Sequence, residues 1–332
     1  MRNRDHRFIL CRPQAGLTDI ISRIGNCVRY GDRFNRFVIV DTNFGGAVHF
    51  RDEFSNYFVS HDNDLILTSK DHVAQFDHLA TYPHSFTGRI NSYRASYDNS
   101  KSAYADLETG EITNFDFTKN YSEPLLLSHA SGGGMRKAKI ALRRLSLSEL
   151  LRKEVELRLA RIGGVYSSIH IRNSDFTTDY EAHVKELQQR NSGLIYVATD
   201  NLKALNFCRE LFGANRVFNF STLPQDAGNP IHSNTLLDAR AHNIDAICDL
   251  ILLASAKTYY FFPLSNPHLT GAKYSGYSKL AEALHNDKVL LRQFIRADAF
   301  GTVARMRLKM RKVLYRGLGL VSTLMPFIRS AN

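Results

Sequence analysis

The chain has 332 residues, a net charge of +11 and 44% hydrophobic residues. This length predicts two domains of ordinary size, and the composition is that of a globular protein, which excludes a disordered or collagen-like chain. No run of about 18 apolar residues is present, and no apolar stretch follows the basic residues at the start, so the sequence predicts neither a transmembrane helix nor a signal peptide.

The positive charge lies mainly at the C-terminal end. Residues 291–332 contain nine Lys or Arg residues and one acid, Asp298, whereas residues 1–290 have a net charge of only +3. We therefore expect the partner of the basic charge to bind this end of the chain. The cysteines show no Cys-x-x-Cys spacing, which indicates buried free thiols in a reducing, cytoplasmic compartment. They are Cys11, Cys27, Cys208 and Cys248.

The first elements form a strand, a turn, a helix and a second strand. Residues 7–12 are predicted as a strand, and residues 19–34 have helical periodicity, with Thr18 or Asp19 as the expected N-cap. Residues 37–41 are the second strand and end at Asp41. The Gly16 turn would place backbone N–H groups at a helix start, which favours anions.

The middle of the chain is less regular. Residues 45–135 contain short apolar runs among polar loops, and Ser131–Gly134 is predicted as a flexible joint. Residues 138–162 are predicted as one long amphipathic helix, although the serines near residue 147 fit an N-cap and a break equally well. We expect domains at residues 1–137 and 138–290, followed by a basic tail at residues 291–332.

The second half alternates strands and helices, which predicts a mostly parallel sheet with right-handed crossovers. Expected strands are residues 165–171, 194–200, 216–220 and 258–262, and expected helices are residues 179–190, 201–212 and 235–256.

The first of these strands ends in His170-Ile171-Arg172-Asn173-Ser174-Asp175. Strand side chains alternate with period two, so His170 and Arg172 share one face. Open α/β sheets bind ligands at the carboxyl ends of their strands, and the guanidinium fork of Arg suits a phosphate. The alternative is a satisfied core histidine beside a surface salt-bridge arginine.

Several motifs follow in a fixed order: the Ala15-Gly16-Leu17 turn, His170-x-Arg172-x-x-Asp175, Thr199-Asp200-Asn201, Asp249 in a long apolar helix, and Phe262-Pro-Leu-Ser265 after the last strand. This order resembles the GT-B fucosyltransferase superfamily, which includes bacterial α-1,6-fucosyltransferases that modify chitin oligosaccharides and the protein O-fucosyltransferases. The resemblance covers residues 8–42 and about 138–285. It departs from the family at Asn173-Ser174 and at Ser265-Asn-Pro-His268.

The resemblance implies a GT-B fold, in which two Rossmann-like domains face each other across a cleft. It implies an N-terminal acceptor domain, a C-terminal domain that holds a nucleotide sugar, first of all GDP-fucose, and an inverting, metal-independent transfer without a further cofactor. Arg172 would contact the donor diphosphate, and His170 would orient the site or contact the donor. The other implied donor-binding residues are Gly16, Asp175, Thr199, Asp200, Asp249 and Ser265.

Several alternatives remain for the carboxylates. Asp175 and Asp200 also fit helix capping. The general base should be a carboxylate of the N-terminal domain, for which Asp41 is chosen because it ends a strand, with Asp52 and Glu53 close to equal. Asp62-Asn63-Asp64 matches the Asp-x-Asp of metal-dependent glycosyltransferases, but it is far in sequence from the donor motifs, and no metal is expected there.

The residue pattern of the tail at residues 291–332 predicts an additional C-terminal helix that is basic and amphipathic. At helical spacing Arg305, Lys309, Lys312 and Arg316 form one stripe, with an apolar face elsewhere. We expect it to lie on an anionic membrane surface, so that the protein is peripheral on the inner membrane face. The alternatives are a helix packed on the core and a nucleic-acid contact, which the absence of interleaved aromatic residues disfavours.

The resulting hypothesis is a glycosyltransferase that acts on a glycan or lipid-linked oligosaccharide during surface polysaccharide or oligosaccharide synthesis. A second hypothesis is a non-catalytic, membrane-peripheral Rossmann-like binding module.

Overall fold

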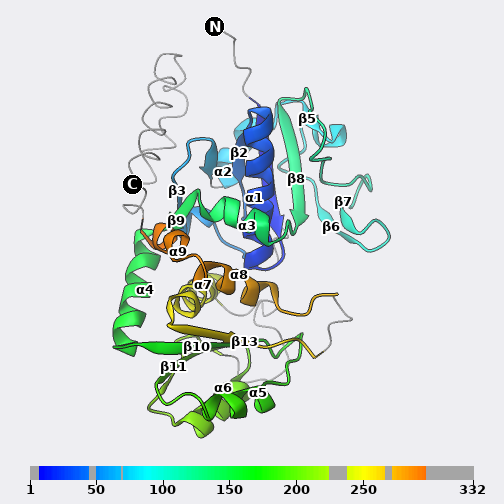
Figure 1. Ribbon diagram of the computed structural model, residues 1–332. Coiled ribbons are helices and arrows are strands. Elements are labelled where there is room, and N and C mark those ends of the chain that lie inside the picture. Colours follow the sequence, from blue (N-terminus) through cyan, green and yellow to red (C-terminus); the bar gives the residue numbers. More distant parts are fainter. Residues whose placement is uncertain (1–6, 45–49, 69, 224–237, 266–270, 297–332) are drawn as a thin grey trace.

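The computed structural model describes residues 7–44, 50–68, 70–223, 238–265 and 271–296. In these ranges the chain forms two parallel sheets, one in each half (Figure 1). The first sheet has the order β4 (Leu65–Leu67), β2 (Phe37–Val40), β1 (Phe8–Gln14), β8 (Leu125–Ser131) and β5 (Thr81–Tyr82). The second has the order β12 (Val217–Phe218), β11 (Leu194–Thr199), β10 (Tyr166–Ile171) and β13 (Thr258–Phe261).

The N-terminal half starts with the predicted strand–turn–helix–strand unit. All seven residues of β1 are buried, as expected for the central strand of a covered parallel sheet. Helix α1 (Leu17–Phe34) buries the predicted apolar face. Its N-cap is Gly16, without a side-chain hydrogen bond, so the prediction of Thr18 or Asp19 as the cap was wrong. The helix ends at its C-cap residue Asn35, which adopts a left-handed backbone conformation.

The predicted helix at residues 138–162 is in fact two helices and a strand. Helix α3 (Met135–Leu142) ends before β9 (Leu145–Leu147), which pairs antiparallel with β3 (Phe58–Ser60), and α4 (Glu149–Ile162) begins after Ser148. Ser148 Oγ accepts a hydrogen bond from the Leu151 N–H, so the N-cap alternative is the correct one. Pairing with a strand about 90 residues away overrides the local helical pattern.

Helix α3 crosses α1 at a glycine. A Cβ on Gly25 would overlap the carbonyl oxygen of Lys137, so the two backbones approach too closely for any other residue. The predicted flexible joint at Ser131–Gly134 connects β8 to α3, with Gly133 held against the Ser22 carbonyl. Since α3 and β9 pack on N-terminal elements, we propose a domain boundary near Ser148 in place of the predicted one at residue 137.

The sheet of the C-terminal half lies between two layers of helices (Figure 1). On one side of β10, Ile169 and Ile171 belong to the core beneath α5 (Tyr180–Gln188) and α6 (Leu202–Phe212). On the other side, Tyr166 and Ser168 donate hydrogen bonds to the backbone of α7 (Ala239–Ser255). Helix α8 (Gly276–His285) completes that layer.

The two halves share one hydrophobic core. Helix α8 packs on α1 and α3, and α9 (Lys288–Ile295) returns to contact β9. The buried Asn243 of α7 donates a hydrogen bond to the Phe50 carbonyl of the N-terminal half at 2.7 Å. The remaining described elements are α2 (Lys70–Val73), the hairpin of β6 (Ala95–Asp98) and β7 (Ala103–Asp106), and three short 3-10 helices at Phe54–Asn56, Ala74–Phe76 and His84–Phe86.

Two further predictions concern the whole chain. All four cysteines are buried and free, as predicted. Among the described residues, no helix is both long and apolar enough to cross a membrane. The predicted basic stripe of the tail lies outside the described residues.

Candidate functional site

The candidate site lies at the carboxyl edge of the second sheet. Strands β10, β11 and β13 are parallel, so the residues that follow Ile171, Thr199 and Phe261 emerge at the same edge. These are the positions at which open α/β sheets bind ligands. The edge brings together six predicted site residues, namely His170, Arg172, Asp175, Thr199, Asp200 and Ser265.

Arg172 is held between two carboxylates. Its Nη2 lies 2.5 Å from Asp175 Oδ1, and its Nη1 lies 2.9 Å from Asp200 Oδ2. The side chain is 23% exposed, so an anion can reach it from solvent. The three charges sum to −1, so the two carboxylates together outweigh the charge of Arg172.

The two carboxylates differ in how firmly they are held. Asp200 is nearly buried and accepts hydrogen bonds from the Asn173 N–H at 2.7 Å and the Ser174 hydroxyl at 2.6 Å. Asp175 is 29% exposed and belongs to the loop itself. Asp175 is therefore the more loosely held partner of Arg172, and Asp200 is the more firmly held one.

Neither carboxylate caps a helix. The N-cap of α6 is Asn201, whose Oδ1 accepts from the Ala204 N–H at 3.1 Å, and α5 begins after Asp179. The capping alternative for Asp175 and Asp200 was therefore wrong. Thr199 Oγ1 accepts a hydrogen bond from the Asn201 N–H, so this predicted donor residue shapes the turn after β11.

The loop after β13 reaches the same place. The Ser265 N–H donates to the Thr177 carbonyl at 2.8 Å, and Thr178 Oγ1 donates to the Arg172 carbonyl at 2.6 Å. The Ser265 side chain is exposed. The backbone thus places this hydroxyl beside the loop that carries Arg172.

His170 is buried and connects the sheet to α8. Its Nδ1 lies 2.6 Å from the Ser278 hydroxyl, and its ring packs 5.0 Å from that of Tyr277. Burial, with a smaller contribution from Arg172, lowers the pKa of His170 to about 3, so the ring is neutral at pH 7. This arrangement fits the positioning role predicted for His170 and disfavours proton transfer.

The first turn of α1 meets the C-terminal half near this edge. The side chain of Thr18 lies within van der Waals distance of a Cβ built on Gly276, at the start of α8. Gly16 is exposed and a Cβ there would meet no atom within 4 Å. Ala15 adopts a φ of 74°, a rare conformation for a residue with a side chain, and such strain is most often retained at functional turns.

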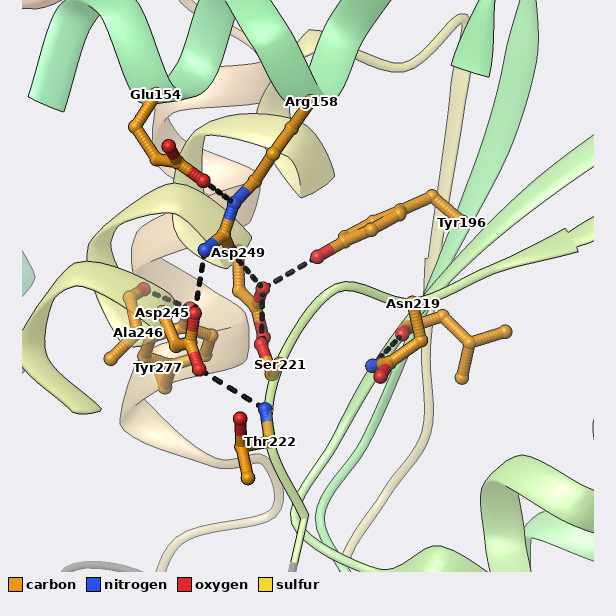
Figure 2. A network of polar contacts seen from close by, with 11 residues as sticks. Glu154, Arg158, Tyr196, Asn219, Ser221, Thr222, Asp245, Ala246, Asp249 and Tyr277 are labelled. Carbon is orange, nitrogen blue, oxygen red and sulfur yellow. Dashed lines mark hydrogen bonds and ion pairs between the residues drawn. The ribbon is translucent and has the colours of Figure 1, made fainter. Parts of the chain in front are cut away.

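Asp249 lies elsewhere, in a buried polar network between α4, α7 and β11 (Figure 2). It accepts hydrogen bonds from the Tyr196 hydroxyl at 2.5 Å and from the Ser221 hydroxyl at 2.8 Å. Arg158 of α4 pairs with Glu154 and Asp245 in the same network. The Thr222 N–H donates to Asp245, so the network fastens the chain after β12 to α7.

The pH dependence of stability should report on Asp249. Burial raises its pKa from 3.8 to about 6, although the Tyr196 and Ser221 hydrogen bonds oppose this. The folded state then binds more protons than the unfolded state between these pH values, so the free energy of unfolding falls as pH rises through them. Because of Asp249, the free energy of unfolding of the wild type should be roughly 3 kcal/mol lower at pH 7 than at pH 3.5. We expect Asp249→Asn to abolish this contribution.

Urea unfolding at a series of pH values measures this difference. Ser221→Ala removes a donor to the carboxylate, so it should raise the pKa of Asp249 further and extend the falling region to higher pH. An unchanged pH profile in Asp249→Asn would contradict the assignment.

Asp41, the predicted base, lies in the core of the N-terminal half. Its carboxylate is 1% exposed and pairs with Arg12 Nε at 2.8 Å. Arg12 also donates to the Ile90 carbonyl and stacks over the Phe44 ring. Asp41 is thus committed to an ion pair, which disfavours a role as base.

The other carboxylates of the N-terminal half are also engaged. Asp52 accepts a hydrogen bond from Tyr57 at 2.5 Å, and Tyr57 lies 3.3 Å from Asn243 of α7. Glu53 precedes the short helix of residues 54–56. In the Asp62-Asn63-Asp64 triplet, Asp62 pairs with Arg144 and accepts from the Asp64 N–H, which gives this motif a structural explanation.

Sequence reasoning missed several residues that build the edge. Ser174 donates a hydrogen bond to Asp200, and Asn201 donates one to the Asn173 carbonyl. The Ser278 hydroxyl is hydrogen-bonded to His170. The N-cap position of Asn201 was the only local signal for any of them. Ser278 is 108 residues from His170, so no spacing rule could connect the two.

The comparisons with known proteins rest on the fold. No protein-family model matches the sequence, and no curated protein matches it significantly. The structure is similar to that of NodZ alpha-1,6-fucosyltransferase co-crystallized with GDP, with a TM-score of 0.55, 15% identity, and 84% of this chain and 92% of that chain covered. It is similar to NodZ soaked with GDP-fucose, with a TM-score of 0.54, 15% identity, and the same coverage.

A further similar structure is fucosyltransferase NodZ from Bradyrhizobium, with a TM-score of 0.55, 15% identity, and 84% and 93% of the two chains covered. At this identity the likeness concerns the fold alone. The predicted fold class is confirmed: the chain has the two-domain GT-B fold of these fucosyltransferases.

Proposed function

We propose that the protein is a glycosyltransferase that moves a sugar, first of all fucose, from a GDP-linked donor to a glycan acceptor. The observation that carries this proposal is the position of Arg172, an accessible guanidinium anchored by Asp200 at the carboxyl edge of the second sheet. The fold likeness to NodZ structures with GDP and GDP-fucose supports the choice of donor.

The proposed reaction is an inverting substitution. An acceptor hydroxyl forms a bond to the anomeric carbon of the donor sugar while the bond from that carbon to the phosphate oxygen breaks. The hydroxyl proton passes to a base, and the nucleoside diphosphate leaves with the bonding electrons. Arg172 stabilises the charge that develops on the leaving phosphate, which a fixed guanidinium does without a metal ion.

The structure supports separate roles for the residues at the edge. Asp200 positions Arg172, and Asp175 serves as its counter-ion until the diphosphate replaces it. Gly16 offers a turn without a side chain, and Ser265 provides an exposed hydroxyl. The proposed base is a carboxylate of the N-terminal half. Asp52 and Glu53 are better candidates than Asp41, because they are only half-buried whereas Asp41 is fully buried in an ion pair.

We further propose that the acceptor belongs to a surface polysaccharide or a lipid-linked oligosaccharide, and that the protein works on the inner face of the membrane. The motivation is the basic segment at residues 291–332. One observation supports the alternative of a non-catalytic binding module. Asp175 and Asp200 together carry more negative charge than Arg172 neutralises.

A nucleotide panel tests the proposed donor. We expect GDP to raise the melting temperature of the protein more than UDP, CDP or inorganic phosphate does. The expected order follows from the proposed GDP-linked donor, because a ligand that binds only the folded state stabilises it. Equal or absent responses to all four ligands would refute the GDP-linked donor.

A further inference from the structure

Helix α3 presents an unusual concentration of positive charge. Its segment Met135–Arg144 contains five basic residues and no acid. Arg136 and Arg143 are exposed, and Lys139 is half-buried between them. The spacing of these three residues places them on one helix face, opposite the residues that pack on α1.

Helix α1 contributes to the same surface. Arg29 and Arg33 are exposed and lie one helical turn apart. Lys137 connects the two helices, because its Nζ lies 3.1 Å from Asn26 Oδ1 of α1. Burial lowers the pKa of Lys137, and Arg29 and Arg136 lower it further, so these cations lie close enough to repel one another.

Most charges of this surface have no counter-ion in the part of the chain that the structure describes. Among the described residues, Arg29, Arg33, Arg136, Lys139 and Arg143 form no ion pair, and Arg144 alone pairs with the acids Asp32 and Asp62. Helix α4 is different, because three of its four basic residues, Arg152, Lys153 and Arg158, each pair with a glutamate of the same helix. Crowded like charges without partners destabilise a fold, and an external anion would relieve the repulsion.

We propose that this α1–α3 surface, formed by Arg29, Arg33, Arg136, Lys137, Lys139 and Arg143, docks on an anionic lipid bilayer. The inference is independent of the donor chemistry. A bilayer suits the outward face of a helix that carries a row of basic side chains, each of which contributes about 1 kcal/mol of attraction to anionic lipid.

Two observations favour a membrane over a nucleic acid. Single-stranded nucleic acid is bound by aromatic rings along a charged groove, and the outward row of α3 contains no aromatic residue. Helix α9, the last element that the structure describes, contacts β9, which directly follows α3 (Figure 1). The basic segment 297–332 follows α9 in the sequence and adds positive charge after the last described element.

Co-sedimentation with vesicles tests the proposal on the full chain. The vesicles contain phosphatidylcholine with about one-third phosphatidylglycerol, and pure phosphatidylcholine serves as the neutral reference. We expect R136Q/K139Q/R143Q to bind the anionic vesicles about tenfold or more weakly than the wild type. The control K185Q/R190Q/K203Q removes the same charge from α5, the turn that follows it and α6, and should bind like the wild type.

Controls for folding and for donor binding accompany the vesicle assay. The altered side chains are outward-facing, so an unchanged melting temperature and unchanged GDP binding would show that the fold and the donor site are intact. Equal weakening in both triple variants would indicate a general charge effect and overturn the proposal. Unchanged vesicle binding in the α3 variant would also overturn it, as would a loss of affinity for duplex or single-stranded DNA without a loss for vesicles.

Discussion

Replacing Arg172 with lysine is expected to lower kcat/KM for glycosyl transfer about 1,000-fold. Lysine retains the positive charge but cannot bind Asp200 and a phosphate with the planar fork of a guanidinium. Asp200 retains its hydrogen bonds from Asn173 and Ser174, so the fold should change little. The defect should therefore appear in catalysis and in GDP affinity, while the melting temperature stays near that of the wild type.

The matched control is Arg216→Lys. Arg216 also lies in the C-terminal half, but it donates to the carbonyls of Asn191 and Gly193 and touches no carboxylate of the site. Steady-state kinetics with a nucleotide-sugar donor should show wild-type rates for this variant. Comparable losses in both variants would mean that the effect on Arg172 is not specific to the leaving phosphate.

Asp175→Asn extends the same experiment. This change removes one of the two carboxylates that hold Arg172. It keeps a side-chain oxygen at that position, which can still accept the hydrogen bond from the loop backbone. If Asp175 is the counter-ion that the donor displaces, GDP should bind at least as tightly as to the wild type. A large loss of GDP affinity would instead indicate that Asp175 contacts the donor directly, as the sequence resemblance implies.

The second large effect is expected at the Arg12–Asp41 pair, where Asp41→Asn should lower the free energy of unfolding by about 3–5 kcal/mol. Arg12 is 1% exposed, so the variant leaves a buried guanidinium without its counter-charge. Urea unfolding at pH 7 measures the change. If Asp41 were the general base, the same variant would keep wild-type stability and lose kcat.

A double-mutant cycle makes this test sharper. Arg12→Met removes the charge that Asp41 neutralises, so the double variant Arg12→Met/Asp41→Asn should be more stable than the sum of the two single changes predicts. Additive losses would show that the two side chains do not depend on each other. Asp52→Asn serves as the reference, because Asp52 is only half-buried and should cost less stability.

The sequence was most informative where the signal is local. The first strand–turn–helix–strand unit and the strands of the second half follow from periodicity and from buried apolar runs. The helix predicted for residues 138–162 was wrong because Leu145 and Leu147 fit the apolar face of a helix as well as a buried strand. Only the pairing of β9 with β3 decides between them, and no nearby residue indicates that pairing.

The candidate site shows the same division. The pattern of His170 and Arg172 at a strand end pointed to the carboxyl edge of the sheet, where the structure places both. The partners of the predicted residues could not be predicted from the sequence, because they are distant in the chain. Arg12 and Asp41 meet across two adjacent strands, and Asp249 accepts hydrogen bonds from Tyr196 and Ser221. These partners give Asp41 and Asp249 interior roles that residue type alone does not reveal.

The most direct test of the proposed function is nucleotide release from a panel of sugar nucleotides, measured by mass spectrometry with an oligosaccharide acceptor mixture. The wild type is predicted to release GDP from GDP-fucose or another GDP-sugar, with a matching mass gain in the acceptor, and Arg172→Lys is predicted to do so far more slowly. Release from no donor, or equal release by the wild type and Arg172→Lys, would contradict the assignment of Arg172 as the diphosphate clamp of a glycosyltransferase.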